Sequence, residues 1–240
     1  MSKPTSPILA YIVAIYAASL LIANILANHM IVFIHWTTTA GILTFPITYI
    51  LASVLAEVYG YNWARRAAWL SLALSALLAL LIQLSLLLPQ PEWYDGAMFA
   101  GAVGSTWRIV VASLTAFTFG KFVNDRAFRR LKQGREGMQG FPFRAMASSI
   151  GGHIVDTTIF TLVAFAGVIP RETLPEMIVI QVCLKWGYEW VALPLTIRVV
   201  KWVAAKEAAY VERCTTQFPS SGPPPGPTGT NRCVAAPKTD

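Results

Sequence analysis

Five ionisable residues stand inside stretches of the sequence that are otherwise strongly apolar. A charged side chain near the centre of a lipid bilayer costs about 2.5 kcal/mol or more, so each one needs a partner, a water-filled cavity or a ligand. Such intramembrane charges commonly mark the path of a transported solute. The sequence therefore predicts a polytopic transporter whose working residues come from this set: Glu57, Arg108, Asp156, Lys185 and Glu189.

We expect the ligand to lie near the middle of the membrane, between the fifth and sixth apolar stretches. Asp156 and Lys185 each fall about half-way along their stretch, and Glu189 follows Lys185 by one helical turn. The proposed substrate-binding residues are Asp156 and Glu189 as acceptors, Arg108 and Lys185 as donors or counter-ions, and Asn24 and Phe45 as pocket walls, with Glu57 on a polar path nearer the cytoplasm.

Purely structural pairings are the alternative explanation for the same charges. Lys185 and Glu189 are spaced to form an intrahelical ion pair that lowers the cost of burying both. Arg108 and Asp156 could pair across two helices, and Glu57 could be solvated at the membrane boundary. Both explanations stay open at the level of the sequence.

Signatures of catalysis are weak. The chain has no phosphate-binding GxxxxGK[ST] loop, no GxSxG elbow and no HExxH metal pair. Ser148, Ser149, His153 and Asp156 could form a hydrolytic group, but small residues such as Gly151 favour tight helix packing there instead. We expect no enzyme, no catalytic residue, no metal site and no cofactor.

The composition indicates an integral membrane protein. Hydrophobic residues make up 55% of the 240 residues, charged residues only 13%, and the mean hydropathy is +0.53. About 20 apolar residues cross the hydrocarbon core of a bilayer. The fold class that we predict is all-α, a bundle of six transmembrane helices in a domain of residues 8–205, with spans at about 8–28, 43–60, 64–88, 102–124, 143–167 and 174–203.

The connections are predicted from turn residues and from polarity. The β-branched and aromatic connector at residues 30–42 is expected to be irregular or re-entrant. Residues 206–240 end in a Pro- and Gly-rich stretch with little apolar content, so this tail is expected to be disordered and cytoplasmic. Residues 1–7 form the expected cytoplasmic N-terminus.

Lysine and arginine residues concentrate in alternate loops, and this pattern predicts which side of the membrane each loop faces. They concentrate after the second span at Arg65 and Arg66, in the loop 126–135, and in the segment 198–213. Positively charged loops stay in the cytoplasm, so both termini should be cytoplasmic in a multi-pass membrane protein. The loop 126–135 should meet anionic lipid; we favour that over direct binding of nucleic acid.

Several segments resemble the vitamin-uptake-like family of queuosine precursor transporters, in the family's order and over roughly residues 10–201. Two positions depart from the family pattern: Ser53 stands where aspartate is common, and Lys121 stands where glutamine is common. The segments that carry the resemblance are ANILAN at 23–28, TFPITYI at 44–50, AEVYGY at 56–61, GKFVND at 120–125, DTTIF at 156–160, and Lys185 followed by Glu189 and Pro194.

The resemblance implies a six-helix inner-membrane importer of 7-cyano- or 7-aminomethyl-7-deazaguanine, which are precursors of the tRNA nucleoside queuosine. The alternative is a substrate-binding membrane subunit that depends on a separate ATPase module. The preferred deazaguanine and the energy source stay open. Ser71, Ser75 and Ala79 could pack within one bundle or join two copies in a homo-oligomer.

Overall fold

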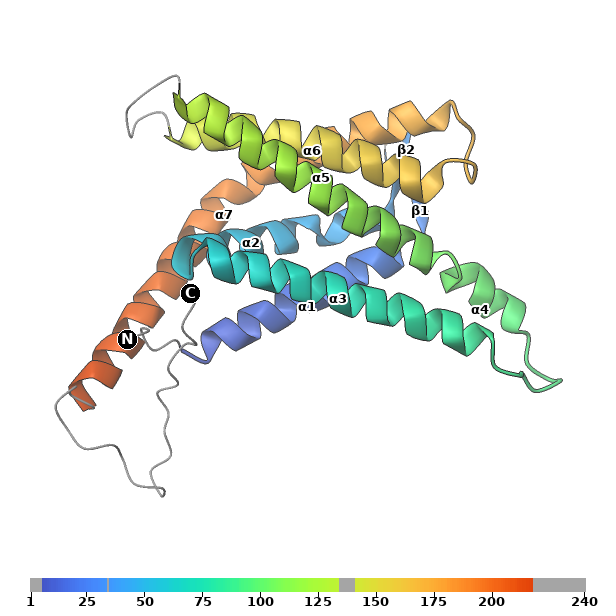
Figure 1. Cartoon of the computed structure of the whole chain (residues 1–240), viewed down its shortest axis with the longest axis horizontal. Coiled ribbons are helices and arrows are strands. Elements are labelled where there is room, and N and C mark those ends of the chain that lie inside the picture. The colour runs from blue at the N-terminus through green and yellow to red at the C-terminus, as the bar shows by residue number, and fades with distance from the viewer. Residues whose placement is uncertain (1–5, 34, 134–140, 218–240) are drawn as a thin grey trace.

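The computed structural model describes residues 6–33, 35–133 and 141–217, and 81% of it is helical (Figure 1). Two strands and a short 3₁₀ helix lie between the first two α-helices. The elements are α1 (Ile8–Leu26), β1 (Met30–Phe33), β2 (Trp36–Thr39), η1 (Ala40–Thr44), α2 (Phe45–Val58), α3 (Tyr61–Leu86), α4 (Gly96–Val103), α5 (Thr106–Gln133), α6 (Phe141–Phe165) and α7 (Thr173–Gln217).

The prediction of a helical membrane protein is confirmed. Within the described residues, four helical stretches are long and apolar enough to cross a membrane: Ile8–Leu26, Ala40–Val58, Tyr61–Leu86 and Gly96–Gly120. A shorter apolar stretch, Gly151–Phe165, lies in α6. The count of six spans and the cytoplasmic location of both termini stay predictions.

The connector between the first two spans differs from our expectation. Instead of an irregular segment, β1 and β2 form an antiparallel pair in which Met30 lies opposite Thr39 and Phe33 lies opposite Trp36. β-Branched and aromatic side chains favour strands, which explains why this segment pairs. The hairpin is a small departure from an all-α fold, and it continues directly into η1 and α2.

The C-terminal end of α7 also differs from the prediction of a disordered tail from residue 206. Residues 206–217 continue the helix, while residues 218–240 of the predicted tail and residues 1–5 lie outside the described part of the chain. Glu207 anchors this extension, because its carboxylate accepts hydrogen bonds from the Tyr59 hydroxyl at 2.5 Å and from the Ser6 amide at 3.1 Å.

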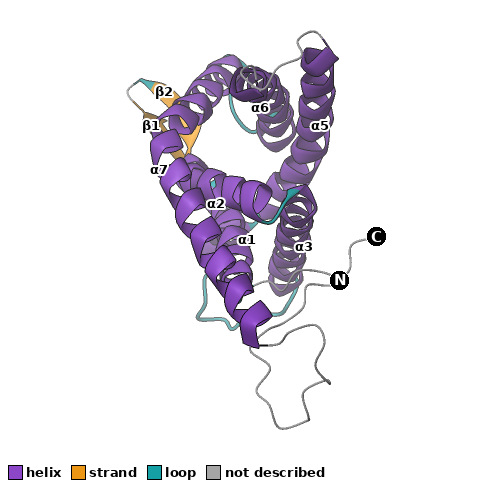
Figure 2. Ribbon diagram, turned by 90° about the vertical axis from the view of Figure 1, so that its left-hand side faces the viewer, coloured by secondary structure: helices purple, strands orange, loops and turns teal. Residues whose placement is uncertain are grey.

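In Figure 2, α2 lies in the middle of the bundle, with α5 and α6 above it and α1 and α3 below it. In Figure 1, α5 and α6 run side by side, and they make the most extensive contact between any two elements. The first part of α7 packs on α6, and its later part turns away across α2. Pro194 lies inside α7, where a proline removes a backbone hydrogen bond and permits such a bend.

Two separate apolar cores hold the bundle together. One joins α1, α2, α3 and α7, and the other joins α5, α6 and α7 to Ala27, the residue that follows α1. The outer surface is also apolar, as lipid contact requires, with exposed residues such as Ile22, Leu77 and Leu81. The first core comprises Leu9, Ile12, Tyr16, Val54, Leu55, Ala67, Ala68 and Val203; the second comprises Ala27, Ile109, Ala112, Ala164, Phe165, Leu174 and Met177.

Gly120 sets the distance between α5 and α6. A Cβ atom at this position would lie 2.8 Å from the Asp156 Cβ and 3.3 Å from the Gly152 carbonyl oxygen. Small residues at helix interfaces in membranes let backbones approach closely. The glycine therefore brings α5 against the segment of α6 that carries Asp156.

We predict that Gly120→Ala lowers the thermal stability of the purified protein, because overpacking of a tight contact typically costs about 1–3 kcal/mol. Gly101→Ala is the matched control, since a Cβ atom there meets nothing within 4 Å. The control should be neutral or slightly stabilising, because alanine favours a helix over glycine. Thermal unfolding followed by tryptophan fluorescence measures both variants, and equal unfolding temperatures would contradict the close contact at Gly120.

Candidate substrate-binding cavity

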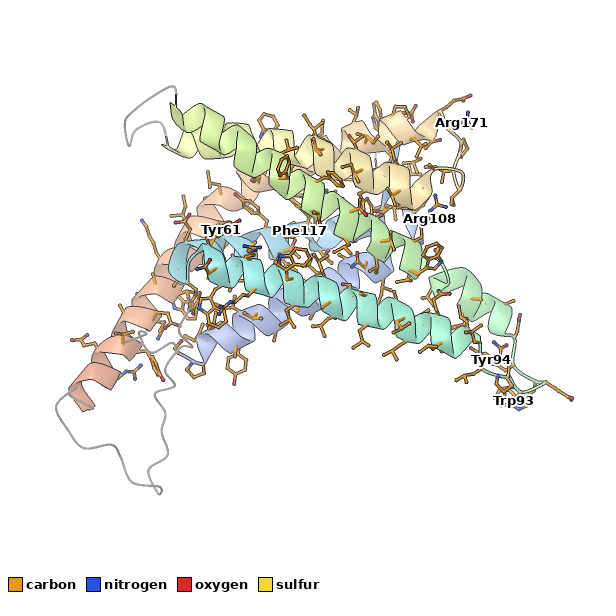
Figure 3. All side chains as sticks on the ribbon, viewed as in Figure 1. Tyr61, Trp93, Tyr94, Arg108, Phe117 and Arg171 are labelled. Atoms are coloured by element: carbon orange, nitrogen blue, oxygen red, sulfur yellow. The ribbon has the colours of Figure 1, made fainter. Side chains whose placement is uncertain are left out.

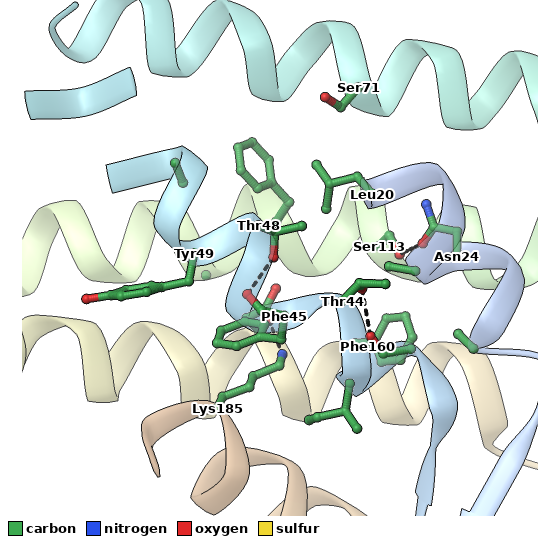
Figure 4. Close-up of a pocket in the computed structure, with 18 of the residues that line it drawn as sticks. Leu20, Asn24, Thr44, Phe45, Thr48, Tyr49, Ser71, Ser113, Phe160 and Lys185 are labelled. Atoms are coloured by element: carbon green, nitrogen blue, oxygen red, sulfur yellow. Dashed lines mark hydrogen bonds and ion pairs between the residues drawn. The ribbon is translucent and has the colours of Figure 1, made fainter. Parts of the chain in front are cut away.

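A cavity of about 520 Å³ lies inside the bundle, lined by residues from α1, β2, η1, α2, α3, α5, α6 and α7 (Figure 4). Its lining includes Tyr16 and Ala68 of the first core and Ala27 of the second, so it lies between the two cores. Its size is typical of sites for small organic molecules. The residues proposed from the sequence that line it are Asn24, Phe45, Asp156 and Lys185.

An ion pair between α6 and α7 forms one wall of the cavity. The Lys185 Nζ lies 2.9 Å from the Asp156 Oδ2 and also donates to the Thr157 hydroxyl at 3.0 Å. The same ammonium group lies 5.7 Å from the centroid of the Phe45 ring, close enough for a cation–π interaction. Figure 4 shows Lys185 reaching toward Phe45. One charged donor, one charged acceptor and one flat apolar ring therefore meet at this wall.

Glu189 makes a different contact from the one that its spacing suggested. Its Oε2 lies 3.4 Å from the His153 Nε2, whereas Lys185 pairs with Asp156. The intrahelical Lys185–Glu189 pair is therefore not the arrangement in this structure. His153 lines the cavity and its ring meets the Phe45 ring edge-on, with centroids 5.9 Å apart. Glu189 is buried and is not part of the cavity lining, so it contacts the site through His153.

Asn24 joins three helices at another part of the lining. Its Nδ2 donates to the Ser75 hydroxyl at 3.0 Å, and its Oδ1 accepts from the Ser113 hydroxyl at 2.8 Å. These bonds link α1 to α3 and to α5 (Figure 4). Buried polar groups in a bundle need such partners, because leaving one unpaired costs free energy. Asn24 therefore fixes the helix positions as well as facing the cavity.

Arg108 lies away from the cavity lining, contrary to its expected role as a ligand donor. Its guanidinium group donates to the backbone oxygens of Val163, at 2.8 Å, and of Ala166, at the end of α6 (Figure 3). A cation at a helix C-terminus satisfies free carbonyl groups and interacts favourably with the helix dipole. Glu57 is exposed near the end of α2 and is likewise outside the lining.

The lining also includes residues that were not proposed as ligand contacts from the sequence, among them His153, Gln181 and Ser75. His153 was considered only as part of a hydrolytic group. Gln181 precedes Lys185 by one turn of α7, and Ser75 lies on a small-residue face of α3. The spacing of Gln181 from Lys185 could have identified it as a site residue, because residues four apart share one face of a helix.

The fold and the cavity define a class: a multi-pass membrane protein that holds a polar binding site between its helices, as solute transporters do. The family described as "Putative vitamin uptake transporter" matches residues 39–199, and the chain belongs to this family. This confirms the resemblance found in the sequence, a transporter role and a location in the cell membrane.

Two relatives have related names. The chain is 25% identical over 173 residues to the "Probable queuosine precursor transporter" of Bacillus subtilis (strain 168), covering 71% of this chain and 75% of that protein. It is also 25% identical over 143 residues to the "Queuosine precursor transporter" of Escherichia coli (strain K12), covering 60% of this chain and 62% of that protein. No solved structure matches the chain.

We predict that the contribution of Asp156 to stability depends on Lys185. Lys185→Met leaves a carboxylate in the bundle without its cation, so it should destabilise the protein more in the presence of Asp156 than in an Asp156→Asn background. Contacting charges typically show coupling energies of about 0.5–3 kcal/mol. Chemical or thermal unfolding of the two single variants and the double variant measures this coupling.

Arg108→Met provides the matched control, because Arg108 bonds to backbone oxygens at the end of α6. Its effect should add to that of Asp156→Asn without coupling. Additive effects for Lys185→Met and Asp156→Asn would contradict the ion pair.

Proposed function

We propose that this protein imports 7-cyano- or 7-aminomethyl-7-deazaguanine across the cell membrane, for salvage into queuosine in tRNA. The observation that supports the proposal most directly is the contact between Asp156 and Lys185 at the wall of the cavity. The names of the two relatives agree with such a substrate.

The chemistry of the substrate edge matches the ion pair. A deazaguanine has a carbonyl oxygen beside a ring N–H, followed by an exocyclic amino group, so it presents one acceptor and then two donors. A carboxylate can accept from both N–H groups, and an ammonium group can donate to the carbonyl oxygen. The 2.9 Å contact between Lys185 and Asp156 holds such a donor and such an acceptor side by side.

Substrate binding would exchange one set of charge-assisted hydrogen bonds for another. In the free protein Lys185 donates to Asp156 and to Thr157. We propose that the substrate enters between the two charges, so that Asp156 takes the amino edge and Lys185 takes the carbonyl oxygen. A neutral substrate leaves the net charge of the site unchanged, which limits the free-energy cost of keeping the occupied site inside the membrane.

Phe45 provides the flat surface that a planar heterocycle needs. Its ring is part of the cavity lining, beside the ammonium group of Lys185. Aromatic rings pack favourably by offset stacking or edge-to-face contact. His153 contacts both the Phe45 ring and the Glu189 carboxylate. We therefore propose that His153 and Glu189 hold the Phe45 ring in position for the substrate.

We also propose the membrane topology expected from the sequence, with six helices (α1, α2, α3, α5, α6 and α7) as the spans of a domain at residues 8–205. The first part of α3, which carries Arg65 and Arg66, lies at the same end of the bundle as the last part of α7 (Figure 1). We take this basic end as cytoplasmic, because positively charged segments remain inside the cell.

We predict that the intact chain restores queuosine in tRNA when it is expressed in cells that can neither make nor import the precursor and that are fed 7-cyano-7-deazaguanine. Asp156→Asn should lose most of this activity, because the amide cannot provide two acceptor oxygens to the amino edge. The measurement is the queuosine content of tRNA, at equal amounts of membrane-inserted protein.

Ile22→Val is a suitable control, because Ile22 is exposed on the apolar outer surface and lies outside the cavity lining. It should restore queuosine as well as the intact chain does. Absence of restoration by a well-inserted intact chain would refute independent import of this precursor. The ATPase-dependent alternative would then predict that adding such a module restores uptake.

A further inference from the structure

Gln181 is a buried polar residue to which no role has been given so far. It belongs to α7, lines the cavity and has only 3% of its surface exposed. Within the described part of the chain, its side-chain Nε2 has no hydrogen-bond partner. A buried amide donor without an acceptor costs about 1–3 kcal/mol, and such groups in native structures call for an explanation. An acceptor on a bound substrate would remove this cost.

Several other polar side chains of the lining already donate to protein acceptors. The Asn24 amide donates to Ser75, and Lys185 donates to Asp156 and Thr157. Three hydroxyl groups donate to backbone oxygens of their own segments: Thr44 to Gly41 at 2.9 Å, Thr48 to Phe45 at 2.9 Å and Ser71 to Ala67 at 2.7 Å. The Gln181 amide differs from all of these donors.

The position of Gln181 relative to Lys185 indicates which part of the substrate it meets. The two residues are four apart on α7, so they lie on one face of the helix with their Cβ atoms about 6 Å apart. In a deazaguanine, the substituent at C7 projects beside the carbonyl oxygen of the six-membered ring. If Lys185 binds that oxygen, the C7 substituent lies near a side chain one turn away on α7, and of the two such residues Gln181 lines the cavity whereas Glu189 does not.

We propose that Gln181 is a specificity-determining residue whose side-chain N–H donates to the nitrile nitrogen of 7-cyano-7-deazaguanine; this inference rests on the function proposed above. The nitrile nitrogen is an acceptor and cannot donate. The aminomethyl group is a cation that only donates, so it offers no acceptor to Nε2. Gln181 therefore favours the cyano form over the aminomethyl form.

The test compares three ligands on the full chain in lipid nanodiscs by equilibrium binding: 7-cyano-7-deazaguanine, 7-aminomethyl-7-deazaguanine and 7-deazaguanine, which lacks the substituent. Gln181→Leu should weaken the cyano ligand by about tenfold, the value of one hydrogen bond of typical strength. Binding of 7-deazaguanine should stay the same. Gln181→Glu should weaken the cyano ligand and strengthen the aminomethyl cation, because a carboxylate accepts from it.

Gln83→Leu is the matched control, since it removes the same side chain outside the cavity lining. The Gln83 Nε2 donates to the Gly104 oxygen at 2.9 Å, so its loss should not change the affinity for any of the three ligands. An equal loss for all three ligands in Gln181→Leu would assign Gln181 a structural role and overturn the inference, while the proposed function stands.

Failure of the proposed function gives a different result, in which the unaltered chain binds none of the three ligands. If Gln181→Leu does not fold, Gln181→Glu decides the matter through the ratio of affinities for the cyano and aminomethyl ligands. A shift of that ratio toward the aminomethyl form supports the inference, and an unchanged ratio overturns it.

Discussion

Opposite charges inside a membrane bundle attract each other strongly, but removing each of them from water costs free energy. Asp156 and Lys185 reduce this cost by meeting at 2.9 Å, and Thr157 provides a further acceptor for the ammonium group. The pair joins α6 to α7, and its two charges cancel each other. In the function proposed above, the ligand replaces both halves of the pair at once and leaves neither charge alone, so the substrate must carry adjacent donors and acceptors.

The rest of the bundle keeps this pair in position. Gly120 lets α5 approach Asp156 closely, and Asn24 ties α1 to the two helices that carry Ser75 and Ser113. Two apolar cores close the bundle on either side of the cavity, so the polar groups remain inside. Arg108 contributes at a distance by binding the carbonyl groups at the end of α6. The site thus depends on contacts from nearly every long helix.

The membrane-protein class and the candidate polar residues could be predicted from the sequence. A charge in lipid is costly, so ionisable residues within long apolar stretches are conspicuous. The similar depth of Asp156 and Lys185 also indicated that these two could meet, but the sequence could not decide between Asp156 and Glu189 as the partner of Lys185. The spacing of Lys185 and Glu189 fits an intrahelical pair, and only the packing of α6 on α7 decides that Lys185 meets Asp156 instead. The helical course of residues 206–217 depends on the contacts of Glu207 with Tyr59 and Ser6, which are distant in the sequence. Local polarity alone therefore placed the start of the predicted disordered tail too early in the sequence.

The central claim is that substrate binds by opening the contact between Asp156 and Lys185. The most direct measurement is a cryo-EM structure of the protein in nanodiscs with 7-cyano-7-deazaguanine. We expect the ligand in the cavity, with its amino edge on Asp156, its carbonyl oxygen on Lys185 and the two side chains separated. A ligand bound elsewhere, with the 2.9 Å contact intact, would contradict the claim.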